Sequence, residues 1–157
     1  MLRIGKLTDY ATGLMAQLAH SPERNVSAQQ LALELGLPGP SVGALLKRLG
    51  RAGLVRGVRG VAGGYALARA PEAISVADII VAIEGPVALT ECALGEGNCK
   101  LESGCATRAH WRRISQAVRV ALEAVSLADL AAPAGTTARA VKFRALSGAA
   151  EQGDIHG

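Results

Sequence analysis

Hydrophobic side chains recur every three or four residues in several stretches of the chain, which is the spacing of one face of an α-helix. The first stretch, residues 2–20, is predicted to form a helix whose effective start is capped by Thr8 and Asp9. Its expected inward stripe comprises Leu7, Tyr10, Ala11, Leu14, Leu18 and Ala19. The chain therefore opens with an amphipathic helix.

A helix pair is predicted next, after a break at residues 22–25. Ser27 is placed to cap a helix over residues 28–35. Gly36 is placed to end that helix, since glycine readily adopts the left-handed conformation that follows helices. Another helix is predicted over residues 40–52, with inward positions at Val42, Leu45, Leu46 and Leu49. A short helix, a glycine-containing turn and a second helix form the pattern of a helix-turn-helix.

A β-hairpin is predicted directly after this pair. Residues 53–58 and 65–68 have the composition of short strands, and residues 59–64 that of a flexible turn. A hairpin in this place is a wing, and its basic tip suits a narrow groove or a row of phosphates. The wing residues expected to contact DNA are Arg59, Gly60, Gly63, Gly64 and Tyr65.

The second half of the chain is again helical. Ser75 is expected to cap a helix over residues 76–84, and Ser126 a last turn over residues 127–131. The longest helical pattern covers residues 107–125, with a heptad-like stripe of Trp111, Ile114, Val118, Ala121 and Val125. A chain this short has little left to cover that stripe, so we expect a second copy of the chain to cover it.

These elements predict a mainly α protein: a winged helix-turn-helix DNA-binding domain with a long C-terminal dimerisation helix. The expected divisions are a DNA-binding region at residues 1–70 and a cysteine loop with the dimerisation helix at residues 71–132. Residues 133–157 have a small, polar, unpatterned composition and are expected to form a disordered tail.

Charge strengthens the DNA-binding prediction. The net charge of the 157 residues is only +4, but residues 35–71 contain basic side chains and no acidic one. The basic residues are Lys47, Arg48, Arg51, Arg56, Arg59 and Arg69. A local block of this kind favours a polyanionic partner, and we expect Lys47, Arg48, Arg51 and Arg59 to contact phosphates of double-stranded DNA.

The composition also limits where the protein works. No apolar run is long enough to cross a membrane, and Arg3, Lys6 and Asp9 interrupt the N-terminal segment, so no secretory signal is predicted. We expect a cytoplasmic protein with reduced thiols and no membrane partner. No P-loop and no histidine–carboxylate pair at catalytic spacing is present, so neither an enzyme nor a small-molecule substrate is predicted.

The three cysteines of the chain lie in one glycine-containing segment. Six residues separate Cys92 from Cys99, and five separate Cys99 from Cys105. Three cysteines cannot all form disulfides within one chain, and isolated core cysteines usually lie in periodic apolar segments instead. Zinc usually prefers shorter paired spacings, whereas an iron–sulfur cluster with a non-cysteine fourth ligand fits the longer gaps best. Spacing alone leaves these alternatives open.

Several motifs together resemble the IscR/SufR/NsrR-type (Rrf-two) family of winged-helix iron–sulfur regulators. They are LTDYA at residues 7–11, GLVRGVRGVAGGYALAR at 53–69, ISVADII at 74–80, the cysteine segment, and LADL at 127–130. The resemblance implies a homodimer that places its helix-turn-helix units in major grooves. It also implies a [2Fe-2S] cluster held by Cys92, Cys99 and Cys105. The TECALGEG and LTDYA variants are most similar to the branch that regulates the SUF iron–sulfur assembly operon.

The fourth cluster ligand departs from one branch of the family. Members of that branch use a histidine three residues after the last cysteine, where this chain has Arg108. In another branch an aspartate of the N-terminal motif reaches across from the partner subunit, and Asp9 matches it. The resemblance therefore favours Asp9 in trans, with His110 as the alternative; a helix cap and a surface histidine are their ordinary roles.

The recognition helix also departs from its relatives. Gly43 and Ala44 stand where relatives often carry polar or charged side chains, so base contacts are expected from Ser41 and Lys47. The alternative functions are a regulator that uses the cysteines as a zinc site or as a thiol redox or nitric oxide switch, and an electron or cluster carrier. A carrier has no use for the basic block.

Overall fold

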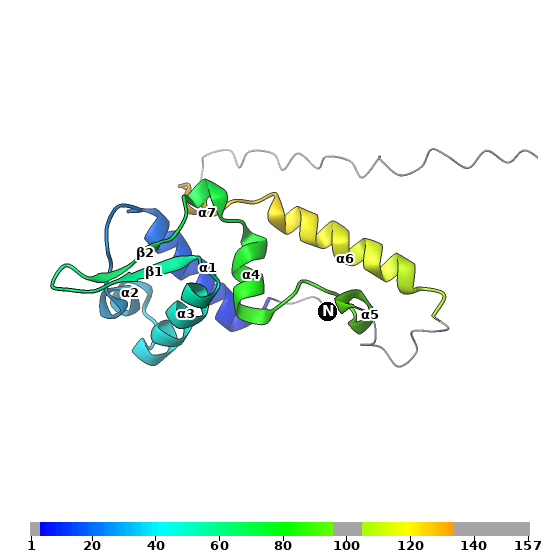
Figure 1. Cartoon of the computed structure of the whole chain (residues 1–157), viewed down its shortest axis with the longest axis horizontal. Helices are drawn as coiled ribbons and strands as arrows, with labels where there is room; N and C mark the ends of the chain where they lie inside the picture. The colour runs from blue at the N-terminus through cyan, green and yellow to red at the C-terminus, as the bar shows by residue number, and fades with distance from the viewer. Residues whose placement is uncertain (1–3, 96–104, 134–157) are drawn as a thin grey trace, which may run out of the picture.

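The computed structural model describes residues 4–95 and 105–133, and Figure 1 shows their arrangement. The tail predicted to be disordered lies outside the described residues, apart from Pro133. The elements in chain order are α1 (Lys6–Ala19), α2 (Ala28–Leu35), α3 (Gly39–Arg51), β1 (Val55–Val58), β2 (Gly64–Leu67), η1 (Pro71–Ala73), α4 (Val76–Glu84), α5 (Glu91–Leu94), α6 (Arg108–Glu123) and α7 (Leu127–Ala131). The described chain is mainly helical with one two-stranded antiparallel sheet.

Helix α1 begins later than the sequence predicts. Gly5 is its N-cap, so Thr8 and Asp9 lie inside the first turn and do not cap the helix. The inward face was predicted correctly at Ala11, Leu14 and Leu18, which are buried, but Leu7 is 46% exposed. The residue of this turn that faces the protein is instead Thr8, which is buried against α4.

The helix-turn-helix forms as predicted. The Ser27 hydroxyl accepts a hydrogen bond from the backbone N–H of Gln30 at 3.1 Å and so caps α2. Gly36 ends α2 in the left-handed conformation, with φ 62°. Helix α3 buries the four predicted positions, Val42, Leu45, Leu46 and Leu49. These side chains join those of α1 in the main hydrophobic core.

The wing is the antiparallel pair β1–β2, in which Val55 pairs with Leu67 and Val58 with Gly64. Strand β1 begins two residues later than predicted, and β2 is shifted by one residue toward the N-terminus. The base of the wing is joined to the connection between α1 and α2, because Val26 and Tyr65 exchange backbone hydrogen bonds of 2.8 and 2.9 Å. The hairpin therefore has a fixed base and a tip that projects from the domain (Figure 1).

After α6 the chain returns to the helices of its N-terminal part. Capping boxes at Ser75 and Ser126 start α4 and α7. Their caps pair as an isolated bridge, in which the Leu127 N–H donates to the Ile74 carbonyl at 2.7 Å. Leu127 is fully buried in the main core. Helix α7 thus anchors the end of α6 to α1 and η1.

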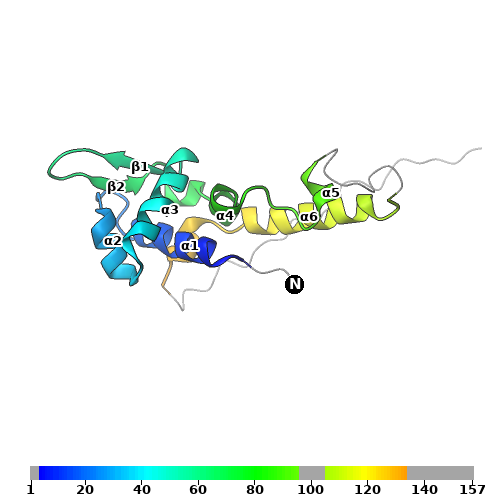
Figure 2. The same cartoon turned by 90° about the horizontal axis from the view of Figure 1, so that it is seen from below.

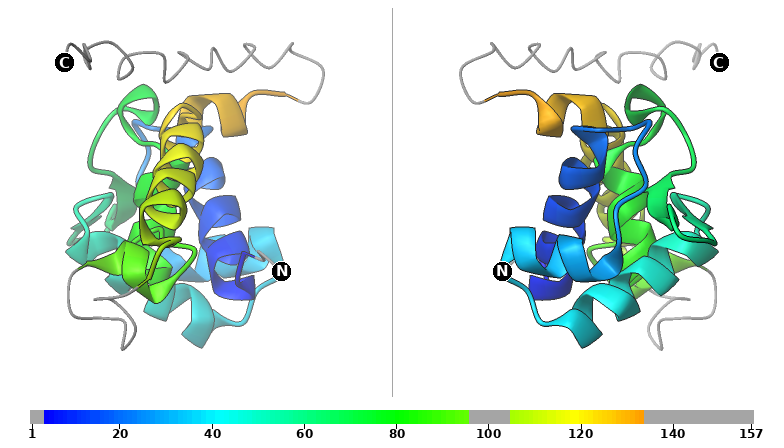
Figure 3. Two further views of the ribbon diagram at one scale, coloured as in Figure 1. Left: turned by 90° about the vertical axis from the view of Figure 1, so that its right-hand side faces the viewer. Right: turned by 90° about the vertical axis from the view of Figure 1, so that its left-hand side faces the viewer.

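Helix α6 extends away from the helix-turn-helix and the wing, as Figures 1 and 2 show, and Figure 3 views the molecule along this direction. Helix α5 lies along α6 near the end that is far from the helix-turn-helix. The sequence predicted only a loop here, so α5 corrects that prediction; its four residues are too few to show a periodic pattern. None of the described helices is long and apolar enough to cross a membrane.

Candidate nucleic-acid interface and cysteine segment

The outer face of α3 is exposed to solvent and includes two residues with little or no side chain. Lys47, Gly43 and Ala44 are exposed, and Ser41 is half-buried in the first turn. The opposite face of the helix is buried in the core, which fixes the direction of these side chains. An α-helix presented in this way can enter a major groove, with Ser41 and Lys47 as the polar groups able to reach base edges.

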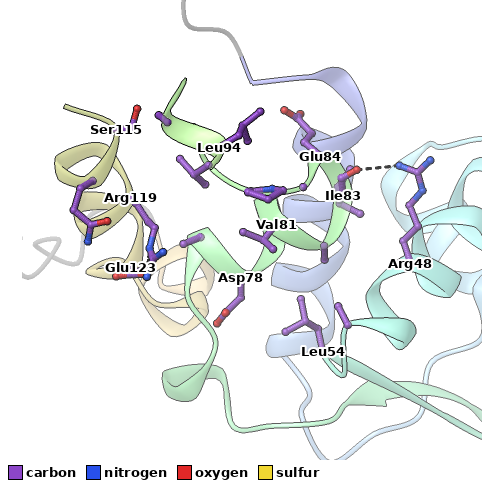
Figure 4. A pocket seen from close by; sticks show the side chains of 18 of the residues that line it. Arg48, Leu54, Asp78, Val81, Ile83, Glu84, Leu94, Ser115, Arg119 and Glu123 are labelled. Atoms are coloured by element: carbon purple, nitrogen blue, oxygen red, sulfur yellow. Dashed lines mark hydrogen bonds and ion pairs between the residues drawn. The ribbon is translucent and has the colours of Figure 1, made fainter. Parts of the chain in front are cut away.

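Arg48 points in a different direction from Lys47. Its Nη1 donates a hydrogen bond of 3.0 Å to the backbone carbonyl of Ile83, in the last turn of α4. Figure 4 shows this contact across the space between α3 and α4. The last four carbonyls of a helix lack partners within the helix, and a cation is favourable at that end. Arg48 therefore has a structural partner in addition to its predicted phosphate contact.

The tip of the wing is exposed at Arg59, Gly60 and Val61. The two glycines that follow are required by the fold. A Cβ on Gly63 would lie 2.4 Å from the Val58 carbonyl oxygen, and one on Gly64 would lie 2.7 Å from that of Val26. These positions allow the hairpin to close and to approach the rest of the domain, whether or not they contact DNA. The predicted DNA contact of Arg59 remains a prediction.

Tyr65 also has a structural place. Its side chain is half-buried against the main core, and its backbone forms the bridge to Val26. Tyr65 therefore fixes the base of the wing, and its contact with DNA remains a prediction.

The cysteine segment connects α4 to α6. Cys92 lies in α5, and Cys105 lies three residues before α6; Cys99 lies outside the described residues. The backbone N–H of Leu89 donates to the hydroxyl of Ser115 at 3.1 Å, and Ser115 is only 5% exposed. This partly buried bond fixes the entrance to the segment against α6.

Cys105 is a free, partly accessible thiol. Its Sγ lies 3.4 Å from the Thr107 hydroxyl. This hydrogen bond, with a backbone hydrogen bond from Thr107 and then the backbone and charge of Arg108, lowers the pKa of the Cys105 thiol, while burial opposes the shift. A lowered pKa favours the thiolate, which is the form that binds metals.

The two candidates for the fourth ligand are both exposed. Asp9 lies in the first turn of α1, and His110 in the first turn of α6. Among residues 4–95 and 105–133 of a single chain, no three side chains of the His, Cys, Asp and Glu types come close enough to hold a metal ion. Of the predicted ligands, the side chains of Cys105, Asp9 and His110 are described, and these three do not form such a group within a single chain.

A cleft of about 1080 Å³ is lined by residues of α3 and α4 and by residues of α5 and α6 (Figure 4). Charged side chains on its walls are Arg48, Arg51, Arg69, Asp78, Glu84, Arg112, Arg119 and Glu123. Two ion pairs form among them: Arg69 with Asp78 at 3.6 Å, and Arg119 with Glu123 at 2.8 Å. The face of α6 that lines the cleft is thus polar, whereas Trp111 and Ile114 on another face are exposed to solvent.

Two functional candidates escaped the sequence analysis: Thr8 and Glu84. The carboxylate of Glu84, the last residue of α4, accepts hydrogen bonds from the Thr8 hydroxyl and from the Gly5 N–H, the latter at 2.8 Å. The helix dipole disfavours a negative charge at the C-terminus of a helix. A glutamate at the last position of a predicted helix therefore indicates that its carboxylate binds partners outside that helix.

Residues 4–133 match the Rrf2 family, described as an iron-dependent transcriptional regulator. The chain is 34% identical over 130 residues to the HTH-type transcriptional regulator IscR of Erwinia tasmaniensis, covering 82% of this chain and 78% of that protein. The IscR of Vibrio cholerae is 32% identical over 130 residues, covering 82% of this chain and 75% of its own length.

Solved structures give the same result. The structure of CymR (YrzC), the global cysteine regulator of B. subtilis, superposes with a TM-score of 0.67 at 34% identity, covering 83% of this chain and 97% of that one. The structure of T. potens IscR superposes with a TM-score of 0.64 at 32% identity, covering 82% and 85%.

Proposed function

The chain belongs to the Rrf2 family of transcriptional regulators, and from this membership we propose that it is a homodimeric regulator that senses iron–sulfur cluster, iron or redox status through a [2Fe-2S] cluster. Regulation of transcription by DNA binding, without enzyme activity, is common to the relatives named above. The cluster, its ligands, the dimer and the target operon are the proposed parts.

The observation that carries the proposal is the position of the cysteine segment. Cys92 in α5 and Cys105 just before α6 bracket the stretch that contains Cys99, and α5 contacts α6. The thiol of Cys105 has a hydrogen-bond partner that favours its thiolate form. Three thiolates in one short segment suit an iron–sulfur cluster, which supplies a redox-active centre that can be oxidised or lost. Asp9 from the partner subunit is the proposed fourth ligand, with His110 as the alternative.

The exposed apolar face of α6 supports the proposed dimer. Trp111 is 41% exposed and Ile114 is 45% exposed, on a helix that extends away from the helix-turn-helix and the wing (Figure 2). Large apolar side chains in this arrangement are typical of a protein interface. A dimer places two α3 helices on one duplex, so that half-site spacing adds to sequence selection.

DNA contacts are proposed for both α3 and the wing. Lys47, Arg51 and Arg59 have exposed side chains and supply phosphate contacts, while Ser41 and Lys47 contact base edges. Nη1 of Arg48 donates to the Ile83 carbonyl, so the phosphate contact of Arg48 is made by the other N–H groups of its guanidinium. The glycines of the wing and Tyr65 shape the hairpin that carries Arg59.

The proposed target is an operon for iron–sulfur assembly of the SUF type. The test is binding of the anaerobically purified protein to the DNA upstream of such an operon, with and without cluster. A brown protein whose affinity for this DNA depends on the cluster supports the proposal, and equal affinity in both states contradicts it.

A second candidate is a winged-helix regulator that uses the cysteines without a cluster, as a zinc site or as a thiol redox or nitric oxide switch. The partly accessible thiol of Cys105, with its lowered pKa, favours this candidate. Visible absorption separates the two, because zinc is colourless. Metal analysis of the purified protein distinguishes zinc from free thiols.

A further inference from the structure

The C-terminal end of α4 and the segment that follows it contact three other helices through hydrogen bonds. Glu84 binds α1, the Ile83 carbonyl binds Arg48 of α3, and Leu89, shortly after α4, binds Ser115 of α6. We call this set of contacts the α4 joint. Cys92 follows Glu84 by eight residues along the chain, so the joint lies between the cysteine segment and the recognition helix.

The contact with α1 joins the exposed Glu84 carboxylate to one buried side chain and one backbone donor. The Glu84 carboxylate accepts from the Gly5 N–H and from the hydroxyl of Thr8, and Thr8 is only 1% exposed. These donors belong to the N-cap and first turn of α1, the turn that also carries Asp9. Glu84 therefore sets the position of that turn relative to α4.

The contact with α3 is made by the residue next to Glu84 in α4. Arg48 binds the carbonyl of Ile83, the residue next to Glu84, and Ile83 is 7% exposed. The backbone carbonyl of Ile83 thus contacts the recognition helix (Figure 4), and the side chain of the next residue, Glu84, contacts the first turn of α1.

We propose that Glu84 is a positioning residue that couples the cysteine segment to the recognition helix, by holding the first turn of α1 on the end of α4 where the Ile83 carbonyl binds Arg48 of α3. The inference rests on the proposed function, because it concerns how cluster occupancy changes DNA binding. A displacement of residues 85–92 moves the end of α4, and the hydrogen bonds of the joint pass that displacement to α1 and α3.

Coupling between two sites is measured as a ratio of affinities. The experiment therefore compares the dissociation constant for the protein's own upstream DNA in the cluster-loaded and cluster-free states, using the full chain. For coupled sites this ratio is typically about 5 to 150. A residue with only a structural role changes both affinities by the same factor and leaves the ratio unchanged.

Two pairs of variants test the joint. Glu84→Ala removes the acceptor, whereas Glu84→Gln keeps a carbonyl oxygen that can accept both hydrogen bonds. Gly5→Ala places a Cβ 2.5 Å from Glu84 Oε1 and displaces that flexible side chain, whereas Gly13→Ala in the same helix meets no atom within 4 Å. The second pair disturbs the joint without changing Glu84, which keeps the test valid if Glu84→Ala fails to fold.

The expected result is a ratio that falls to within about twofold of one in Glu84→Ala and Gly5→Ala, and remains that of the wild type in Glu84→Gln and Gly13→Ala. A wild-type ratio in both disrupting variants overturns the inference. Failure of both to take up cluster, with their controls loading normally, also overturns it, since Glu84 would then act at the cluster. A ratio of one in the wild type itself contradicts the proposed function.

Discussion

Lys47 and Arg48 are neighbours on the recognition helix, and their substitution by alanine is expected to have different effects. Lys47 is exposed on the open face of α3, while Arg48 donates a 3.0 Å hydrogen bond to the Ile83 carbonyl. Lys47→Ala should weaken DNA binding, with a small effect on stability. Arg48→Ala should lower the stability of the free protein.

The magnitudes follow from these contacts. Loss of one phosphate contact reduces the slope of log K against log salt by about 0.9, and this is expected for Lys47→Ala. A hydrogen bond from a charged donor contributes about 1.5–3 kcal/mol when buried, and the exposure of Arg48 reduces this to about 1 kcal/mol. For a chain of this size, about 1 kcal/mol lowers Tm by roughly 2–4 °C.

Fluorescence anisotropy with labelled DNA across a series of KCl concentrations gives the salt slope, and differential scanning calorimetry of the free protein gives Tm. Arg51→Ala is the control, since it removes the same charge from the same helix. The reasoning is refuted if Lys47→Ala and Arg48→Ala reduce the salt slope equally and neither lowers Tm.

The remaining predictions concern the wing, the fourth ligand and the core. Arg59→Ala should weaken binding to all DNA sequences and reduce the salt slope by about 0.9; a loss confined to one sequence would instead show that Arg59 contacts bases. Asp9→Ala should accelerate cluster loss in air, followed by visible absorption, and an unchanged rate would favour His110. Leu49→Ala, at a fully buried position of α3, should lower the free energy of unfolding in urea by about 2–5 kcal/mol; a change below 1 kcal/mol would contradict its place in the core.

Much of the fold could be predicted because local signals agreed with tertiary packing. Ser27 and Gly36 mark the ends of α2 through short-range hydrogen bonds and a left-handed turn, both of which depend on neighbouring residues alone. The buried face of α3 followed from spacing, because an amphipathic helix has one way to bury four aliphatic side chains.

The failures came from contacts between residues distant in sequence. Thr8 and Glu84 are 76 positions apart, and their bond buries the first turn of α1 on its Thr8 side, leaving Leu7 exposed. The periodicity of hydrophobic residues cannot indicate a hydrogen bond between two polar residues so far apart in the sequence. The phosphate contact predicted for Arg48 stays a prediction, but the sequence did not show the additional carbonyl partner of Arg48 in α4.

The candidate site was only partly predictable. The cysteines are visible in the sequence, but the contact between α5 and α6 depends on tertiary structure. The proposed ligand Asp9 is exposed in its own chain, as a ligand supplied to a partner subunit must be. Sequence spacing within one chain cannot identify such a ligand.

The most direct test of the whole account is the affinity of the protein, purified without air, for its own upstream DNA before and after removal of the cluster. The account predicts a brown, iron-containing protein whose affinity changes by about fivefold or more when the cluster is removed. A colourless, iron-free preparation that binds the same DNA as tightly as a reconstituted sample would contradict it.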